Sequence, residues 1–220
     1  MRAYHFLSAE NALDDVTRKR VKISEIDKLN DPFELWCAAQ GNKRTRRAML
    51  LWKKEMARRF GVLCFCPEWN NPVLWSHYAD SHRGMCLGFE IEGSILQPVR
   101  YVRTRPDLTI PPTDETARQL LLTKYWDWRY EKEWRGWCSL GQKEEGGNYF
   151  YYFDAKIRLR EIVAGPLCTT PETTIKEATE DYSYHVRVIK SRLAFKTFQV
   201  VRNRRGFAAK AAPQPVRGLR

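Results

Sequence analysis

The chain has 220 residues, 43% of them apolar and 13% aromatic, and a formal net charge of +12. This composition can fill one sizeable core and excludes a globally disordered chain. No apolar run approaches the roughly 20 residues of a membrane-spanning helix, and Met1 leads directly into a strand-like run instead of a secretory signal. The six cysteines form no C-x-x-C pair. We therefore predict a cytoplasmic protein without a membrane span or disulfides, whose cysteines are small buried side chains.

The first half of the chain alternates short strands with helices. Apolar patterning predicts strands over 3–7, 20–24 and 61–66, and helices over 8–19, 44–60 and from 71 onwards. Ser8 and Asn71 are expected N-caps, and Pro72 fits the first helical position. Asn30 to Glu34 (NDPFE) forms a turn, since Pro32 restricts the residue before it. The helix over 44–60 has one apolar stripe, opposite its basic residues, made of Met49, Trp52, Met56 and Phe60.

The second half is richer in strands. We expect strands over 84–91, 99–103, 133–140, 149–153, 158–164, 185–189 and 194–201. A longer helix is predicted over 113–130, and a short one after Thr170-Pro171. Strands that arrive singly and in hairpins between a few helices favour an α+β fold with a mixed, mostly antiparallel sheet. The expected organisation is one domain over 1–201, followed by a flexible basic tail over 202–220.

Two segments carry nearly all of the net charge. Residues 43–59 hold eight basic residues and one acid, and residues 202–220 hold six basic residues and no acid, so together they contribute +13. Such clustering favours a polyanion, nucleic acid before membrane, because phosphate neutralisation releases counterions. The alternative is a solvated helix face with a solubilising tail. The candidate nucleic-acid contacts are Arg44, Arg46, Arg47, Lys53, Lys54, Arg202, Arg204 and Arg205.

Several strong catalytic signatures are missing from the sequence. It has no P-loop, GxGxxG, HExxH or GxSxG pattern, which weighs against ATPases, dinucleotide oxidoreductases, zincins and serine hydrolases. Cys64, Cys66 and His77 match no standard zinc spacing, so no metal is expected. Asp154 and Lys156 resemble the D/E-x-K element of metal-dependent nucleases, which leaves a nuclease as one alternative function.

The first candidate site is the acidic pair Glu131 and Glu133. If a strand begins at Glu131, both carboxylates point to the same face, because side chains alternate along a strand. Paired carboxylates suit the stabilisation of a cationic transition state, with neighbouring tryptophans as apolar walls. The alternative is that both acids ion-pair with adjacent arginines on a wet surface. A second candidate is the helix and loop that carry His77, Tyr78 and Arg83, although a lone histidine on a helix is more often a surface or core residue.

Six segments taken in order resemble a known family. They are Tyr4-His5-Phe6, then residues 30–34, 61–66, 74–79, 83–89 and 130–135. This order is similar to the bacterial and phage family known as domain of unknown function 2971, related to AbiGi-type abortive-infection proteins. The resemblance covers about residues 1–165. That family name implies no activity.

A second resemblance, to compact ADP-ribosyltransferases of the DarT kind, implies one. It assigns catalysis to Glu133, with Glu131 as the accessory acid, and a central element to residues 75–78. The S-T-S triplet of those enzymes is missing here, and the central element is predicted to be helical. The resemblance implies NAD as substrate, with NAD-contacting residues Tyr4, His5, Asn30, Asp31, Trp75, His77, Tyr78 and Arg83.

The chemistry that this resemblance implies is coherent with an acidic pair. Cleaving the nicotinamide–ribose bond passes through an oxocarbenium-like state, as in glycoside hydrolysis, which a fixed carboxylate stabilises. The leading expectation is an ADP-ribosyltransferase that modifies a nucleic acid or protein acceptor in phage defence or as a toxin. The alternatives are a non-catalytic nucleic-acid-binding defence protein and the metal-dependent nuclease.

Overall fold

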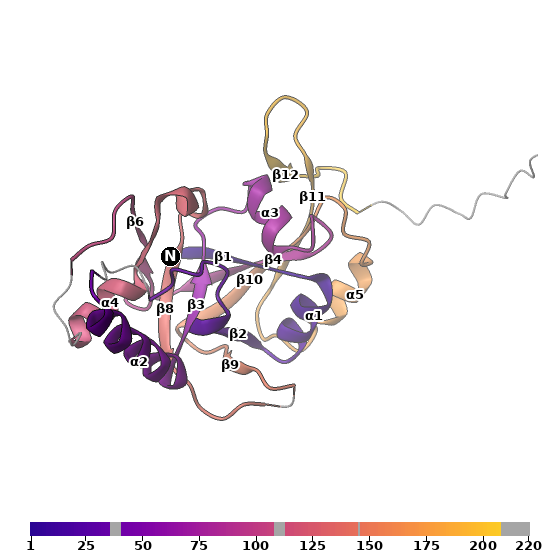
Figure 1. Cartoon of the computed structure of the whole chain (residues 1–220). Helices are drawn as coiled ribbons and strands as arrows, with labels where there is room; N and C mark the ends of the chain where they lie inside the picture. Colours follow the sequence, from indigo (N-terminus) through magenta and orange to yellow (C-terminus); the bar gives the residue numbers. More distant parts are fainter. Residues whose placement is uncertain (36–40, 108–112, 145, 208–220) are drawn as a thin grey trace, which may run out of the picture.

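Two five-stranded sheets form the framework of the protein (Figure 1). The structure is a computed structural model and describes residues 1–35, 41–107, 113–144 and 146–207. The first sheet has the spatial order β1 (Arg2–Leu7), β4 (Met85–Ile91), β10 (Ile157–Ala164), β11 (Arg187–Leu193) and β12 (Val200–Arg202). The second has the order β5 (Gln97–Pro98), β8 (Trp134–Ser139), β3 (Phe60–Phe65), β2 (Arg20–Glu25) and β9 (Tyr149–Tyr152).

Strand pairing confirms the expected α+β class with mixed, mostly antiparallel pairing. Within the two sheets only β10 and β11 run parallel, and a separate parallel pair joins β6 (Arg100–Val102) to β7 (Thr123–Tyr125). The strands divide between two sheets, where the sequence patterns had suggested one. An isolated antiparallel bridge between Tyr4 and Cys66 connects β1 to the end of β3. The largest hydrophobic cluster combines side chains of both sheets, and within it Phe65 of β3 meets Phe89 of β4 edge to face.

The helices begin at the expected caps. The Ser8 hydroxyl caps α1 (Ala9–Thr17), and the Asn71 side chain caps α3 (Pro72–Tyr78), with Pro72 at the first helical position. α2 (Lys43–Arg59) buries Met49 and Met56 of the predicted stripe and packs beside α4 (Asp114–Leu121). The remaining helical elements are η1 (Ile26–Lys28), η2 (Trp126–Glu131) and α5 (Glu172–Glu177). No helix within the described residues is long and apolar enough to span a bilayer.

The predicted helix over 113–130 is wrong beyond Leu121. The Thr123 hydroxyl donates to the Gln119 carbonyl at 2.6 Å and closes the last turn of α4. The next residues form β7, which pairs with β6, and then the 3₁₀-helix η2. Pairing with a distant strand therefore outweighed the helix propensity of this segment. The change matters for the site, because it places Lys124 on a strand that faces the acidic pair.

The end of the domain also differs from the prediction. Instead of a strand over 194–201, β11 continues to Leu193 and a loop leads to the short strand β12. β12 includes Arg202, and Phe207 packs against the main core. The expected tail boundary at 202 is therefore too early. Residues 208–220, which hold the rest of that predicted tail, lie outside the described residues.

Candidate functional site

Five charged side chains are buried together where α4, β7, η2 and β8 meet. Each is at most 6% exposed, and the group comprises Glu34, Lys124, Glu131, Glu133 and Arg135. Three carboxylates therefore face two cations. We call this group the ionic cluster. Buried charges of this density are costly unless they are paired and hydrogen-bonded.

Arg135 organises one side of the ionic cluster. Its guanidinium donates two hydrogen bonds to Glu34, at 2.7 and 2.5 Å, and two to Glu133, at 2.7 and 3.0 Å. A further bond of 2.6 Å runs to the Leu121 carbonyl at the end of α4. The planar fork of arginine matches two carboxylates in this way. Arg135 thus fastens the loop of Glu34 and the end of α4 to strand β8.

Lys124 and Tyr78 organise the other side. The Lys124 ammonium donates to Glu131 at 2.5 Å and to Glu133 at 3.1 Å. The Tyr78 hydroxyl, at the end of α3, donates to the second oxygen of Glu131 at 2.5 Å. Glu131 therefore receives one donor on each oxygen, whereas Glu133 receives donors from both cations. Each Glu131 oxygen retains one acceptor position for a ligand.

The two neighbouring glutamates have opposite pKa shifts. Burial raises the pKa of Glu131, and the charge of Glu133 adds to that rise against the opposing effect of Lys124. Burial would also raise the pKa of Glu133, but the charges of Arg135 and Lys124 outweigh it and bring this pKa down to about 2. Glu133 is therefore the permanently ionised partner of the cations, and Glu131 is the carboxylate that more readily takes up a proton.

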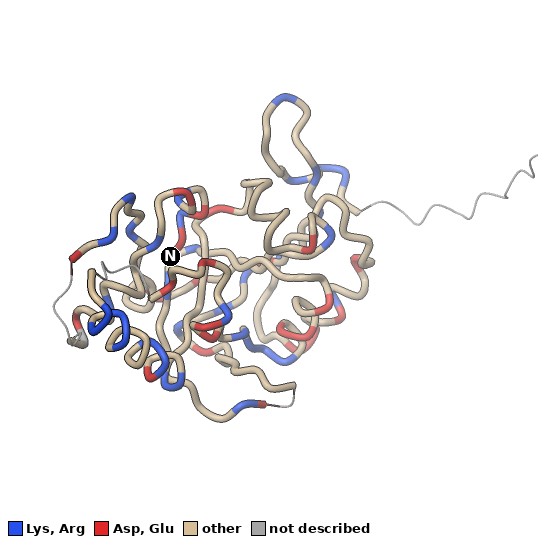
Figure 2. The backbone as a smooth tube through the Cα atoms, viewed as in Figure 1, with Lys and Arg blue, Asp and Glu red and all other residues tan. Residues whose placement is uncertain are grey.

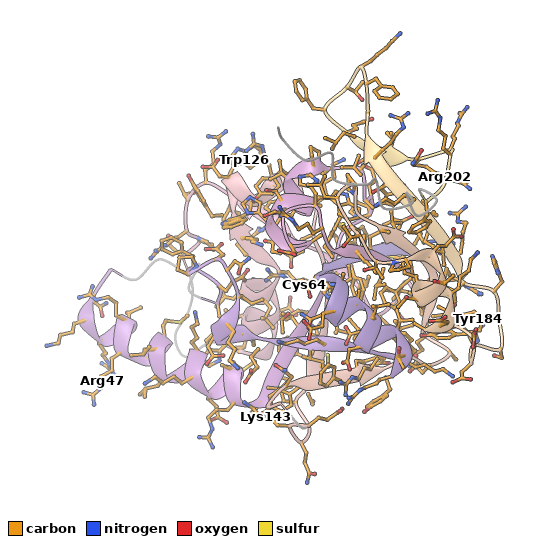
Figure 3. The ribbon with its side chains drawn as sticks, turned by 90° about the vertical axis from the view of Figure 1, so that its right-hand side faces the viewer. Arg47, Cys64, Trp126, Lys143, Tyr184 and Arg202 are labelled. Atoms are coloured by element: carbon orange, nitrogen blue, oxygen red, sulfur yellow. The ribbon has the colours of Figure 1, made fainter. Side chains whose placement is uncertain are left out.

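A cavity of about 240 Å³ opens above the ionic cluster. Its walls combine the cluster with side chains of β1, β3 and α3, among them Tyr4, His5, Phe65, Leu74 and Tyr78. Lys28 and Asn30 also line it. Figure 3 places Cys64, another wall residue, near the centre of the molecule between its two halves. The cavity therefore has aromatic and apolar walls and an acidic floor, the usual composition of a small-molecule site.

His5 is fixed in one tautomer within this cavity. Its Nδ1 lies 2.8 Å from the Cys64 carbonyl, and a carbonyl only accepts, so Nδ1 carries the proton. Burial lowers the pKa of His5 and outweighs the opposing effect of that carbonyl. The ring is therefore neutral, and Nε2 presents a lone pair. It can accept a hydrogen bond from a hydroxyl of a bound ligand.

The structure brings six of the ten residues of the predicted catalytic and NAD-contacting set to this cavity. They are Tyr4, His5, Asn30, Tyr78, Glu131 and Glu133. The strand expected to start at Glu131 is wrong, because Glu131 ends η2 and β8 begins at Trp134. Between the two glutamates, Lys132 adopts a left-handed conformation with φ of 48°. This turn, and not strand alternation, lets both carboxylates reach Lys124.

The other four residues of that set lie outside the cavity walls. Trp75 is fully buried, and its indole donates to the Trp69 carbonyl at 2.6 Å, so it belongs to the core. His77 is exposed and stacks on Tyr130. Arg83 is exposed as well. Asp31 is buried and accepts the Phe33 backbone N–H at 2.9 Å, which makes it the cap of its own turn.

Sequence reasoning gave no role to Glu34, Lys124 or Arg135. Glu34 and Arg135 do belong to the segments 30–34 and 130–135 that carry the first family resemblance. Lys124 was assigned to a helix, so its position toward the acidic pair was not foreseen. The only local signal was an unusual density of charge among tryptophans between 124 and 135.

The predicted nucleic-acid contacts form two separate groups (Figure 2). On α2, Arg44, Arg46, Arg47 and Lys54 are exposed. Lys53 was expected on the same solvent face, which is wrong: it is half-buried and donates to the Glu34 carbonyl at 2.6 Å. Lys53 therefore anchors the loop that carries Glu34.

The second basic group lies at the end of β12. It comprises Arg202, Arg204 and Arg205, all exposed. Figure 3 shows Arg47 and Arg202 on opposite sides of the molecule, in agreement with the distant positions of α2 and β12 in Figure 1. The two groups therefore do not form one continuous patch.

The residues behind the nuclease alternative have a structural role. Asp154 accepts the backbone N–H groups of Lys156 and Ile157 at 2.8 and 2.9 Å, and the Tyr151 hydroxyl at 2.8 Å. Its carboxylate thus closes the turn between β9 and β10. Within the described part of the chain, no three His, Cys, Asp or Glu side chains are grouped to hold a metal ion.

Comparisons of the chain with protein-family models, curated proteins and solved structures found no match. The functional argument therefore depends on the geometry of the cavity and on the charges around it.

Proposed function

We propose that this protein cleaves the nicotinamide–ribose bond of NAD and transfers ADP-ribose to an acceptor. The observation that carries the proposal is the convergence of His5, Tyr78 and the pair Glu131 and Glu133 on one cavity with an acidic floor. The nicotinamide ring of NAD is cationic, and the transition state places positive charge on the ribose. A site with more carboxylates than cations favours both.

The reaction needs no redox step. The bond between C1′ of the ribose and the nicotinamide nitrogen breaks, and its electron pair stays on nicotinamide, which leaves as a neutral molecule. The acceptor forms the new bond to C1′ and gives up a proton. Glu131 stabilises the positive charge and takes that proton, because burial has raised its pKa toward the range of a useful base.

This assignment exchanges the roles that the sequence suggested for the two glutamates. Glu133 is held by Arg135 and Lys124. With a pKa near 2 it is a poor base. We assign it the positioning of Lys124, which in turn orients Glu131. His5 Nε2 is placed to accept a ribose hydroxyl, and the aromatic walls provide a surface for the nicotinamide ring.

The volume of the cavity limits what it holds. At about 240 Å³ it is smaller than the roughly 300–1,000 Å³ of sites for drug-sized ligands. It accommodates the nicotinamide riboside end of NAD, and the adenosine end extends past the rim. Lys28 lines this rim and is positioned to meet the phosphates, although its ammonium also ion-pairs with Glu25.

The test measures NAD consumption and the transfer of labelled ADP-ribose to DNA, RNA and lysate proteins by the purified full chain. Glu131→Gln is expected to lower both by at least about 100-fold, the effect of removing a preorganised electrostatic group. The control is Glu55→Gln, which removes an exposed acid on α2. Wild-type turnover in a folded Glu131→Gln variant, or no NAD turnover by the wild type, overturns the proposal.

We further propose a cytoplasmic setting in phage defence or as a toxin. The five described cysteines, Cys64, Cys66, Cys86, Cys138 and Cys168, are free thiols, which fits a reducing compartment rich in NAD. Expression of the wild type, but not of Glu131→Gln, should then arrest growth and deplete cellular NAD.

A second candidate is nucleic-acid binding without catalysis. The observation that favours it is the solvent face of α2, where Arg44, Arg46, Arg47 and Lys54 are all exposed. Binding that persists in a protein without NAD turnover would support this candidate over the first.

A further inference from the structure

The loop between β11 and β12 exposes two phenylalanines almost completely. It projects from the body of the molecule (Figure 1), and Phe195 and Phe198 are 90% and 99% exposed. Exposed rings of this size are costly in water unless something covers them. We call β11, this loop and β12 the projecting hairpin.

The projecting hairpin has a defined attachment. The Ala194 N–H donates to the Gln199 carbonyl at 2.9 Å and closes the loop. At its base Val200 is fully buried, and its N–H donates to the Asn70 carbonyl at 2.8 Å. The base is therefore held beside the start of α3, so the two rings are presented by an anchored support.

The hairpin and its flanks are strongly basic. Between Tyr182 and Phe207 the chain has no acidic residue and seven basic ones: Arg187, Lys190, Arg192, Lys196, Arg202, Arg204 and Arg205. Arg187 pairs with Glu161, and Lys190 donates to two carbonyls, but the other five are exposed or half-exposed around the two rings. The Arg192 guanidinium lies 4.2 Å from the centre of the Phe195 ring, a cation–π contact.

The hairpin also borders the candidate site. Phe198 and Gln199 line a second cavity of about 270 Å³, together with Asn71 and Lys132. Glu131 and Leu74 are walls of this cavity and of the first one. A ligand that contacts the hairpin can therefore extend along a wall that ends at Glu131.

We propose that the projecting hairpin is a docking surface for single-stranded nucleic acid, whose bases stack on Phe195 and Phe198 while the surrounding cations contact the phosphates. Planar bases match exposed rings, and a polyanion matches a segment without acids. A duplex keeps its bases stacked inside and cannot offer their faces to two phenylalanines. A flat membrane would cover the rings but would not enter the cavity that Phe198 shares with Glu131.

For the proposed transferase, the same surface identifies the acceptor as a single strand led to Glu131. This part of the inference rests on the proposed function. Binding to the hairpin does not, because it involves neither NAD nor the ionic cluster. The two can therefore be tested apart.

The experiment measures fluorescence anisotropy of labelled single-stranded DNA and RNA oligonucleotides with the full chain, without NAD. Phe195→Leu and Phe198→Leu are each expected to weaken binding by about 5-fold to 100-fold, because leucine keeps an apolar side chain but offers no flat face for stacking. Phe195→Tyr and Phe198→Tyr should bind like the wild type. Tyr152→Ala removes a half-exposed ring on β9, at the other end of the molecule in Figure 1, and is the control.

Other outcomes overturn the inference. Equal affinity for a duplex, or wild-type affinity in both leucine variants, excludes base stacking at the hairpin. Binding to vesicles of phosphatidylcholine and phosphatidylserine that is lost in alanine variants, with no oligonucleotide binding, identifies a membrane contact instead. If the hairpin binds single strands but no NAD turnover is found, only the proposed transfer reaction fails.

Discussion

Replacing Glu133 and Glu131 by glutamine, one at a time, should change stability in opposite directions. Glu133 carries an ionised carboxylate that Arg135 and Lys124 hold in place. Glutamine is neutral, and its amide group would bring N–H donors toward donors that already point at this position. At Glu131, burial raises the pKa, so the ionised form is disfavoured in the folded protein. Glu131→Gln should therefore leave stability unchanged or raise it.

The magnitude for Glu133 follows from its pKa. The fall from 4.5 to about 2 means that folding favours the ionised carboxylate. At about 1.4 kcal/mol per unit, this favours the folded state by roughly 3 kcal/mol at pH 7. The estimate agrees with the ~3–5 kcal/mol lost when one partner of a buried ion pair is removed. Because the folded pKa is depressed, the contribution is complete above about pH 4.5 and is lost as pH falls toward 2.

Urea unfolding at pH 7 and pH 3, followed by circular dichroism, measures both effects. With a denaturant slope of about 3 kcal/mol/M, Glu133→Gln should lower the urea midpoint by about 1 M at pH 7. The difference should fall to less than half at pH 3, where the stabilisation of the wild-type carboxylate is partly lost. Equal stability of Glu133→Gln and wild type at pH 7, or greater destabilisation by Glu131→Gln, would refute this account of the ionic cluster.

Two further predictions concern Asp15 and α2. Burial raises the pKa of Asp15 to about 7, above its ordinary 3.8, so the folded protein keeps a proton that the unfolded chain releases, and stability falls as pH rises from about 4 to 7. Asp15→Asn should remove this loss, at most roughly 4 kcal/mol, so its advantage in urea unfolding is larger at pH 8 than at pH 5; an equal difference at both pH values contradicts it. Reversing the charges of Arg46, Arg47 and Lys54 should flatten the salt dependence of oligonucleotide binding, by a slope of roughly 0.7 per lost phosphate contact on single strands, and an unchanged slope would mean that α2 is only a solvated face.

Local patterns in the sequence were sufficient for much of the framework. The caps at Ser8 and Asn71, and the apolar stripe of Met49 and Met56, were predicted correctly. Such features depend on residues three or four positions apart, whose chemistry is visible in a short window. The same reasoning failed after Leu121 and after Leu193, where pairing with distant strands set the structure.

The sequence by itself also identified the segments that carry charge and aromatic residues, and so pointed to Glu131 and Glu133. Only the tertiary structure decided how these two acids differ. Arg135 reaches Glu34 across 101 positions of the chain, and Lys124 faces both acids because β7 replaces a predicted helix. Burial and the placement of two cations then set one pKa up and the other down. These forces act through space over a few ångströms, so they depend on which distant residues the fold brings into contact.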